Sequence, residues 1–355
     1  MTEEICFIRS DSFCVSFVKM AGPMNIAGSG HIADFEETET GKYYSIFLNT
    51  IASIAKGFDG KIIKNVGDGL VCYFPKTSDL KNDSGFQDVI GFGITAMAAR
   101  HDINKKLHEE KLPYAIDYRI SIDYGKVEVA ETAASGGAED LFGSPMNLCA
   151  KVNTIAPING MAIGYNLYQI LKRIFSDPLS FSYSKYYDFR QIGEYTWEEG
   201  NQHISYPVYS LTASKDINKT SSANQQLGLE QKAPRNIMIV DDEQDILLTY
   251  DSILRGEGYN VETFSNPHDA LLHFIHADKS YYDLVILDIR MPNLNGLQLY
   301  HRLKARDKDI KIFFLSALEA SKEIASIYPE LKHGDIIKKP IEKEYFVEKI
   351  NKLLQ

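Results

Sequence analysis

Residues 236–242 read NIMIVDD, and residues 284–288 read LVILD. Each is a short apolar run that ends in aspartate, which is typical of a strand buried on both faces of a parallel sheet. The surrounding pattern predicts strands at 236–240, 261–264, 284–288, 311–315 and 335–338, and helices at 244–256, 268–276, 296–305, 322–327 and 343–354. Strands that alternate with helices in this way predict an α/β domain over residues 235–355, with helices on both faces of the sheet.

Polar side chains follow the strands of this domain. Asp241 and Asp242 follow the first strand, Asp288 ends the third, Ser316 follows the fourth and Lys339 follows the fifth. Because ligands bind at the carboxyl ends of parallel strands, these side chains are expected to converge. Three carboxylates together predict a hard divalent cation such as Mg²⁺, and a lysine with a hydroxyl group suits a phosphoryl group.

These motifs, IVDDEQDI, VILDIRMPNLNG, FFLSA and IIKKPI, resemble those of the response regulator receiver domain, which has a flavodoxin-like (βα)5 fold. The resemblance implies that Asp288 accepts a phosphoryl group from a sensor histidine kinase or phosphotransfer protein. It also implies that Asp241, Asp242 and Asp288 bind Mg²⁺. Ser316 and Lys339 would contact the phosphoryl oxygens.

Residues 212–234, TASKDINKTSSANQQLGLEQKAP, are polar and lack apolar periodicity, so they are predicted to be a linker. The pattern before it predicts strands at 13–18, 61–64, 69–74, 118–122, 126–130 and 160–163, and helices at 43–55 and 86–110 with another from residue 147. The second hairpin is expected to turn at residues 123–125. The β-α-β-β-α-β order predicts a ferredoxin-like α+β domain over residues 1–211.

Three strings in this first domain carry chemistry: KIIKNVGDGLVCYF (61–74), YRISIDYG (118–125) and EDLFGSPMNLCAKVN (139–153). Together with FRQIGEYTWEEG and PVYSL near its end, they resemble the class III nucleotidyl cyclase homology domain. That family binds two metal ions through two aspartates. The resemblance assigns one of these positions to Asp68, whereas Lys19 occupies the other. Because an ammonium group repels a metal ion, the resemblance implies a degenerate metal site. Lys19 ends the strand beside the hairpin that carries Asp68, so these two side chains are expected to lie within salt-bridge reach.

The remaining cyclase positions are partly retained. Lys64 and Asp140 match the pair that reads adenine, and both have an alternative interpretation as solvated surface charges. Asn147 matches the asparagine that stabilises the transition state, whereas Lys151 replaces the arginine of that pair. Lysine keeps the charge but loses the planar, bidentate guanidinium group. ATP with Mg²⁺ or Mn²⁺ therefore remains a candidate ligand for this domain.

Composition limits the other functional classes. The chain has 355 residues and a net charge of −10, and residues 235–355 carry 16 basic and 20 acidic residues. Both halves are acidic, so direct DNA binding is not expected. The four cysteines show no CxxC pair and are predicted to be buried thiols. No apolar run is long enough to span a membrane, so a cytoplasmic protein is expected.

Three functional interpretations follow. The first is a phosphorelay response regulator whose cyclase-like domain is a non-catalytic output that dimerises or binds nucleotide. The second is an active adenylate cyclase that makes cyclic AMP under control of receiver phosphorylation. The third is an adaptor that binds no nucleotide. Lys19 favours the first and third, and a homodimer through the N-terminal domain is expected because cyclase domains build their sites between two chains.

Overall fold

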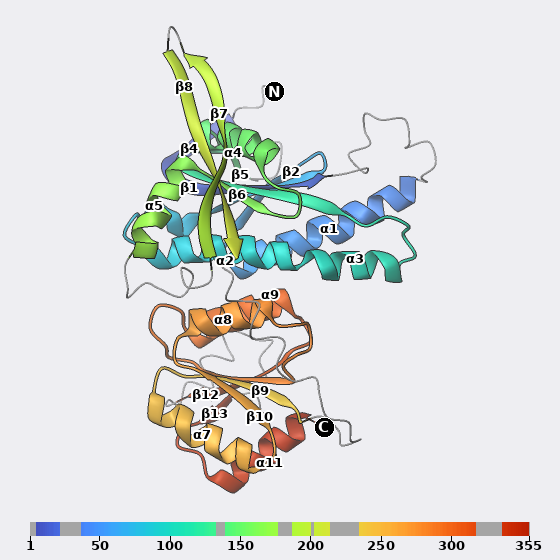
Figure 1. Ribbon diagram of the computed structural model, residues 1–355, viewed down its shortest axis with the longest axis vertical. Helices are drawn as coiled ribbons and strands as arrows, with labels where there is room; N and C mark the ends of the chain where they lie inside the picture. The colour runs from blue at the N-terminus through green and yellow to red at the C-terminus, as the bar shows by residue number, and fades with distance from the viewer. Residues whose placement is uncertain are drawn as a thin grey trace. The chain divides into compact units, whose positions relative to one another are not determined.

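The structure is a computed structural model that describes residues 5–21, 37–132, 139–176, 187–199, 202–213, 234–316 and 336–354. The chain divides into two compact units, Met1–Ile217 and Asn218–Gln355 (Figure 1). Most of the predicted linker, residues 214–233, lies outside the described residues. Among the described helices, none has the length and apolar character needed to cross a bilayer.

The N-terminal unit is built on one eight-stranded sheet. Its elements are β1 (Ile5–Ala21), α1 (Glu37–Gly57), β2 (Lys61–Val66), β3 (Gly69–Phe74), a 3-10 turn (Pro75–Ser78), α2 (Asp83–Ala98), α3 (Arg100–Glu109), β4 (Asp117–Thr132), β5 (Glu139–Phe142), α4 (Ser144–Ile155), β6 (Met161–Gly164), α5 (Tyr165–Ser176), β7 (Tyr187–Glu199) and β8 (Gln202–Ala213).

The order of the strands confirms the predicted fold class of this unit. The sheet runs β2-β3-β1-β4-β6-β8-β7, and β5 pairs separately with β4. Within its first part, β1 is antiparallel to β3 and β4, and β2 is antiparallel to β3. A β-α-β-β-α-β chain in this strand order is a ferredoxin-like core.

Helices lie on both faces of the N-terminal sheet. Figure 1 shows α1, α2 and α3 on one face and α4 on the other. On the α4 face, Cys149 belongs to a buried cluster with Phe13, Phe17 and other side chains of β1, β3, β4 and β5. Asn153 of α4 donates hydrogen bonds to the carbonyl oxygens of Phe17, at 3.1 Å, and Arg119, at 3.2 Å. These bonds tie the helix to the two strands beneath it.

The predicted second hairpin is wrong, because β4 runs through residues 123–125 as one continuous strand paired with β1. Asp123 is completely buried, and its carboxylate accepts a hydrogen bond from the Tyr206 hydroxyl group at 2.7 Å. Gly125 is needed for close packing rather than for a turn. A Cβ atom at this position would lie 2.8 Å from Cγ of Pro145, in the first turn of α4.

The predicted long helix over residues 86–110 is also wrong in detail, since the structure has two helices separated at Ala99. Helix α2 is apolar and buried along most of its length. Helix α3 is polar and buries only Ile103 and Leu107. The break coincides with this change from a buried to an amphipathic pattern.

The C-terminal unit has a five-stranded sheet in the order β10-β9-β11-β12-β13, with every pair parallel. Its elements are β9 (Asn236–Val240), α7 (Gln244–Gly256), β10 (Asn260–Phe264), α8 (Pro267–His276), β11 (Leu284–Asp288), α9 (Gly296–Arg306), β12 (Lys311–Ser316), β13 (Ile336–Lys338) and α11 (Lys343–Leu354). The predicted α/β class is confirmed. The helix predicted over 322–327 lies outside the described residues.

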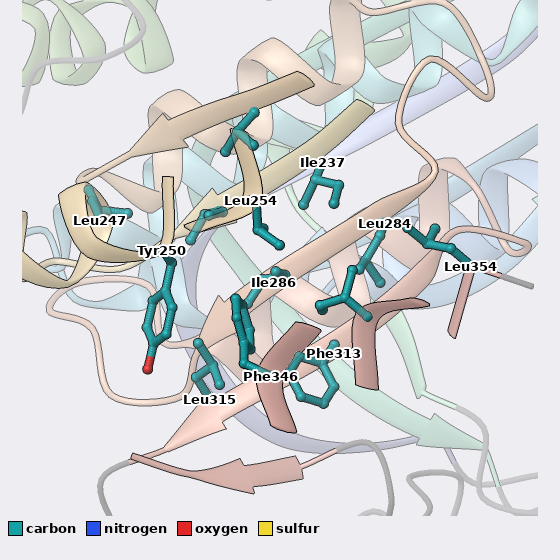
Figure 2. Packing of buried hydrophobic residues seen from close by; sticks show 13 residues of the cluster. Ile237, Leu247, Tyr250, Leu254, Leu284, Ile286, Phe313, Leu315, Phe346 and Leu354 are labelled. Carbon is teal, nitrogen blue, oxygen red and sulfur yellow. The ribbon is translucent and has the colours of Figure 1, made fainter. Parts of the chain in front are cut away.

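The core on one face of this sheet explains the helix periodicity. Figure 2 shows side chains of α7 and α11 packed against the apolar strands. The two helices contribute Leu247, Tyr250, Leu254, Phe346, Ile350 and Leu354, which are buried with Ile237, Leu284, Ile286, Phe313 and Leu315 of the strands. Helices α8 and α9 cover the other face (Figure 1), so the strands are apolar on both sides.

Candidate functional site

The carboxyl edge of the parallel sheet gathers three of the predicted site residues. Asp241 follows β9, Asp288 ends β11 and Lys339 follows β13. The Lys339 ammonium group donates one hydrogen bond to Oδ2 of Asp241 and another, at 2.7 Å, to Oδ1 of Asp288. All three residues are buried: Asp241 is 1% exposed, Asp288 is 5% exposed and Lys339 is 9% exposed. The Lys339 ammonium group is therefore a buried cation that lies between two carboxylates.

Backbone groups complete this arrangement. The Arg290 amide donates to Oδ2 of Asp288 at 2.6 Å, and the Glu243 amide donates to Oδ1 of Asp241 at 3.1 Å. Burial raises the pKa of Asp241 above its ordinary value, although the hydrogen bond from Lys339 opposes that shift. Burial by itself lowers the pKa of Lys339, but its hydrogen bonds to both carboxylates outweigh burial and raise that pKa overall. Lys339 is therefore protonated at neutral pH.

Asp242 is not brought into this cluster. Asp242 is exposed, and Ser316 ends β12 with a side chain outside the described residues. Within the described ranges, no three His, Cys, Asp or Glu side chains lie close enough to hold a metal ion. A physical reason is that the Lys339 ammonium group already bridges the two buried carboxylates.

In the N-terminal unit, two glycines set the shape of the β2–β3 turn. Gly67 has a φ of +60°, which favours glycine. A Cβ atom on Gly69 would lie 2.6 Å from the Phe17 ring, so only glycine lets β3 approach β1 this closely. The Met20 amide then donates to the Asp68 carbonyl oxygen at 3.1 Å, which holds the turn against β1.

This turn brings Asp68 next to Lys19, as the sequence predicts. The Lys19 Nζ atom lies 3.6 Å from Oδ1 of Asp68. The Asp68 side chain is 14% exposed, and its Oδ2 atom is buried without a hydrogen-bond partner in the described structure. The pKa of nearby Tyr44 is raised by burial and by the charge of Asp68. An ammonium group thus stands where the cyclase resemblance implies a metal-binding carboxylate.

The proposed base-reading residues lie on two strands that do not pair with each other, Lys64 on β2 and Asp140 on β5. A salt bridge of 3.6 Å between Lys61 and Glu139 nevertheless links side chains of these two strands. The Lys64 side chain lies outside the described residues, and Asp140 is partly exposed with Oδ1 accepting from the amide of the next residue. The structure therefore brings the two strands together without defining a Lys64–Asp140 contact.

Asn147 and Lys151 lie four residues apart on α4, so they share one face of the helix, and both are exposed. The Lys151 ammonium group lies 5.6 Å from the centre of the Tyr195 ring of β7, a cation–π distance. These two positions are open to solvent in the single chain.

Sequence reasoning missed Arg119, which lies directly opposite Lys19 on the adjacent strand. The only signal was that Arg119 is the second residue of the YRISIDYG string. Its partner on β1 is one hundred residues away in the chain. Only the strand register reveals that the two cations are neighbours.

Comparison with known proteins decides what the C-terminal unit is. Residues 237–351 match the family model of the response regulator receiver domain. The C-terminal unit is a receiver domain. Over 120 residues it is 34% identical to the response regulator SaeR of Staphylococcus aureus (strain USA300), a match that covers 34% of this chain and 50% of that protein. The chain thus spans about half the length of this curated relative.

Two solved structures are each similar to one part of the chain. The non-phosphorylated HemR receiver domain from Leptospira biflexa is similar over 34% of this chain and 94% of its own, with 26% identity and a TM-score of 0.31. The adenylyl cyclase CyaB from P. aeruginosa is similar over 60% of this chain and 97% of its own, with 16% identity and a TM-score of 0.47.

The donor set of the receiver domain suits a hard cation. Carboxylate oxygens of Asp241 and Asp288 are the ligand type that Mg²⁺ prefers, and exposed Asp242 is adjacent in the chain. These residues would hold the ion once the Lys339 ammonium group no longer bridges both carboxylates. The bound cation would neutralise negative charge on the carboxylates and on an incoming phosphoryl group.

Proposed function

We propose that this chain is a phosphorelay response regulator in which Asp288 is the phospho-acceptor. The observation that supports this most directly is the buried contact of Lys339 with Asp288 and Asp241, in a domain that matches the receiver family. A histidine kinase or phosphotransfer protein would supply the phosphoryl group. In this proposal the chain meets that donor in the cytoplasm.

The residues around Asp288 suit phosphoryl transfer. A carboxylate oxygen of Asp288 attacks phosphorus, the bond from phosphorus to the donor histidine nitrogen breaks, and that nitrogen keeps the electron pair. The product is an acyl phosphate on Asp288. Because Lys339 donates to one carboxylate oxygen and the Arg290 amide donates to the other, a hydrogen-bond donor lies beside whichever oxygen attacks. Lys339 and Ser316 would then hydrogen-bond to the phosphoryl oxygens.

Labelling with a small phosphodonor tests this assignment. Purified protein is incubated with phosphoramidate and Mg²⁺, and intact mass is measured for wild type, Asp288→Asn and Asp309→Asn. Asp309 is an exposed aspartate of the same domain and is the matched control. Wild type and the Asp309 variant are expected to gain one phosphoryl group, and the Asp288 variant none. Equal labelling of all three proteins would refute the assignment.

For the N-terminal unit we propose a non-catalytic, dimerising output that binds nucleotide, rather than an active adenylate cyclase. The ion pair between Lys19 and Asp68 supports this choice, because the ammonium group supplies charge but cannot act as a Lewis acid. Cyclic AMP production is expected to stay at background with ATP and either Mg²⁺ or Mn²⁺, before and after phosphorylation. Robust cyclic AMP synthesis would instead establish the cyclase alternative.

The proposed dimer rests on the exposed positions Asn147 and Lys151, which the cyclase resemblance assigns to a site shared between two chains. Analytical ultracentrifugation of the full chain at micromolar concentration is expected to give twice the monomer mass. A monomer at every concentration tested would remove dimerisation from the proposal.

A further inference from the structure

Two cationic side chains meet in the middle of the N-terminal sheet. Lys19 of β1 is directly opposite Arg119 of β4 and directly opposite Gly69 of β3. Residues directly opposite in antiparallel strands project from the same face of the sheet. Because Phe17, two residues before Lys19, belongs to the buried cluster with Cys149 of α4, this is the face that α4 covers.

Among the residues that the structure describes, the charges of this row are not balanced. Like charges directly opposite each other destabilise a sheet unless a counter-charge lies between them. Asp68 is the acid paired with Lys19, and its 3.6 Å distance is long for a charge-assisted hydrogen bond. The carboxylate of Asp117, two residues before Arg119 on β4, is already bonded to Arg100 at 2.7 Å. Lys19, Arg119 and Asp68 together therefore leave one net positive charge.

Arg119 also carries an unused donor. Its Nε atom is buried and has no hydrogen-bond partner in the part of the chain that the structure describes. A buried donor without an acceptor is costly, so an acceptor from outside the chain would stabilise this site. The Lys19 side chain is 38% exposed, which leaves its ammonium group accessible from solvent. Because Lys19 and Arg119 are directly opposite on one face of the sheet, a single anion at this position would lie near both cations.

A metal ion does not fit here. The position that would carry the second carboxylate holds Lys19, and the described residues contain no metal-binding cluster of acids, histidines or cysteines. Within the described ranges, Asp68 is the acid that pairs with Lys19. The site thus has the opposite charge from one that binds a divalent cation.

We propose that Lys19 and Arg119 bind the phosphate oxygens of a nucleoside polyphosphate directly, without a divalent cation. This inference rests on the proposed nucleotide-binding role of the N-terminal unit and replaces its expected metal dependence. Arg119 supplies a planar guanidinium group suited to phosphate, and Lys19 supplies a point charge at the position where a metal would otherwise bridge protein and phosphate. The nucleotide base would extend toward the neighbouring strands β2 and β5.

Calorimetric titration of the full chain with ATP tests the proposal. One series contains EDTA, and a second contains Mg²⁺ in both cell and syringe. Binding in EDTA is expected to be at least as tight as in Mg²⁺. Lys19→Met and Arg119→Met are each expected to weaken it about tenfold or more, because each removes a charged donor to phosphate. Lys105→Met is the matched control, since Lys105 is exposed on α3, on the other face of the sheet.

Two further arms separate the explanations. Lys19→Asp is expected to convert ATP binding from EDTA-resistant to dependent on Mg²⁺ or Mn²⁺. Tripolyphosphate is expected to bind more weakly than ATP. If the protein binds tripolyphosphate but not ATP, the ligand is not a nucleotide. If wild-type protein binds ATP only with a divalent cation, the whole inference is overturned, while the proposal that this unit binds nucleotide stays intact. Unchanged affinity in well-folded Lys19 and Arg119 variants, checked by circular dichroism, would also overturn it.

Discussion

The buried carboxyl group of Asp123 is expected to make the stability of the N-terminal unit depend on pH. Burial raises the pKa of Asp123 from 3.8 to about 6, although the hydrogen bonds from Tyr206 and Tyr124 oppose this shift. A carboxyl group with a raised folded-state pKa stabilises the fold at low pH, and this contribution is lost as pH rises through about 6. The difference between 3.8 and about 6 corresponds to about 3 kcal/mol in total. Between pH 5.0 and pH 7.5 the expected loss is about 1.4 kcal/mol.

Asp123→Asn isolates this contribution, because an amide stays neutral at both pH values. We expect the free energy of unfolding of the variant to fall by about 1.4 kcal/mol less than that of wild type between pH 5.0 and pH 7.5. Urea unfolding followed by tryptophan fluorescence measures it, since the single tryptophan of the chain, Trp197, lies in the N-terminal unit. Asp188→Asn, at an exposed aspartate of β7, is the matched control and is expected to keep the wild-type pH dependence.

A second variant tests the same prediction independently, in case the Asp123→Asn protein does not fold. Tyr206→Phe removes the hydroxyl donor to the Asp123 carboxylate, so it is expected to raise the pKa of Asp123 further and to steepen the pH dependence. If neither variant changes the difference in stability between pH 5.0 and pH 7.5 relative to wild type, burial of an ionisable Asp123 is not the cause and the reasoning is refuted.

Two other substitutions have defined outcomes. Lys339→Met leaves two buried carboxylates without their cation, so it is expected to lower the free energy of unfolding of the receiver domain by about 3 kcal/mol. Urea unfolding followed by circular dichroism measures this change. Lys343→Met, at an exposed position, is the control and should change that free energy by under about 0.5 kcal/mol. Gly69→Ala introduces a Cβ atom 2.6 Å from an aromatic ring and is expected to cost about 2 kcal/mol in tryptophan-monitored unfolding. Gly41→Ala, which meets nothing within 4 Å on α1, should not destabilise the unit, and an equal loss in both glycine variants would exclude the close approach as the cause.

The receiver site was largely predictable from sequence. In a parallel sheet each strand end leads to the same edge, so motifs at strand ends are sufficient to group Asp241, Asp288 and Lys339. The exposed position of Asp242 was not predictable in this way. Two adjacent residues that follow a strand point in different directions, and only one of this pair contributes to the buried contact with Lys339.

The N-terminal site was less predictable, because its residues meet across strands. Reading the turn motif was enough to anticipate that Lys19 and Asp68 pair. A stretch containing Asp-Tyr-Gly also satisfies the usual criteria for a turn, and this led to the incorrect hairpin at residues 123–125. Tertiary context overrides that local preference, since Asp123 is buried with Tyr206 and Gly125 makes room for α4.

The sequence by itself determined the two fold classes, the strand-end positions of the acidic residues and the lysine in the receiver domain, and the presence of Lys19 where the cyclase resemblance implies an aspartate. These features depend on local periodicity and on residue type, and both are visible in the amino-acid sequence. The tertiary structure alone decided that Lys19 faces Arg119, that Asp123 is buried and that Lys339 bridges two carboxylates. Each of these depends on the register between segments far apart in the chain, and register is set by the packing of whole strands and helices rather than by any local pattern.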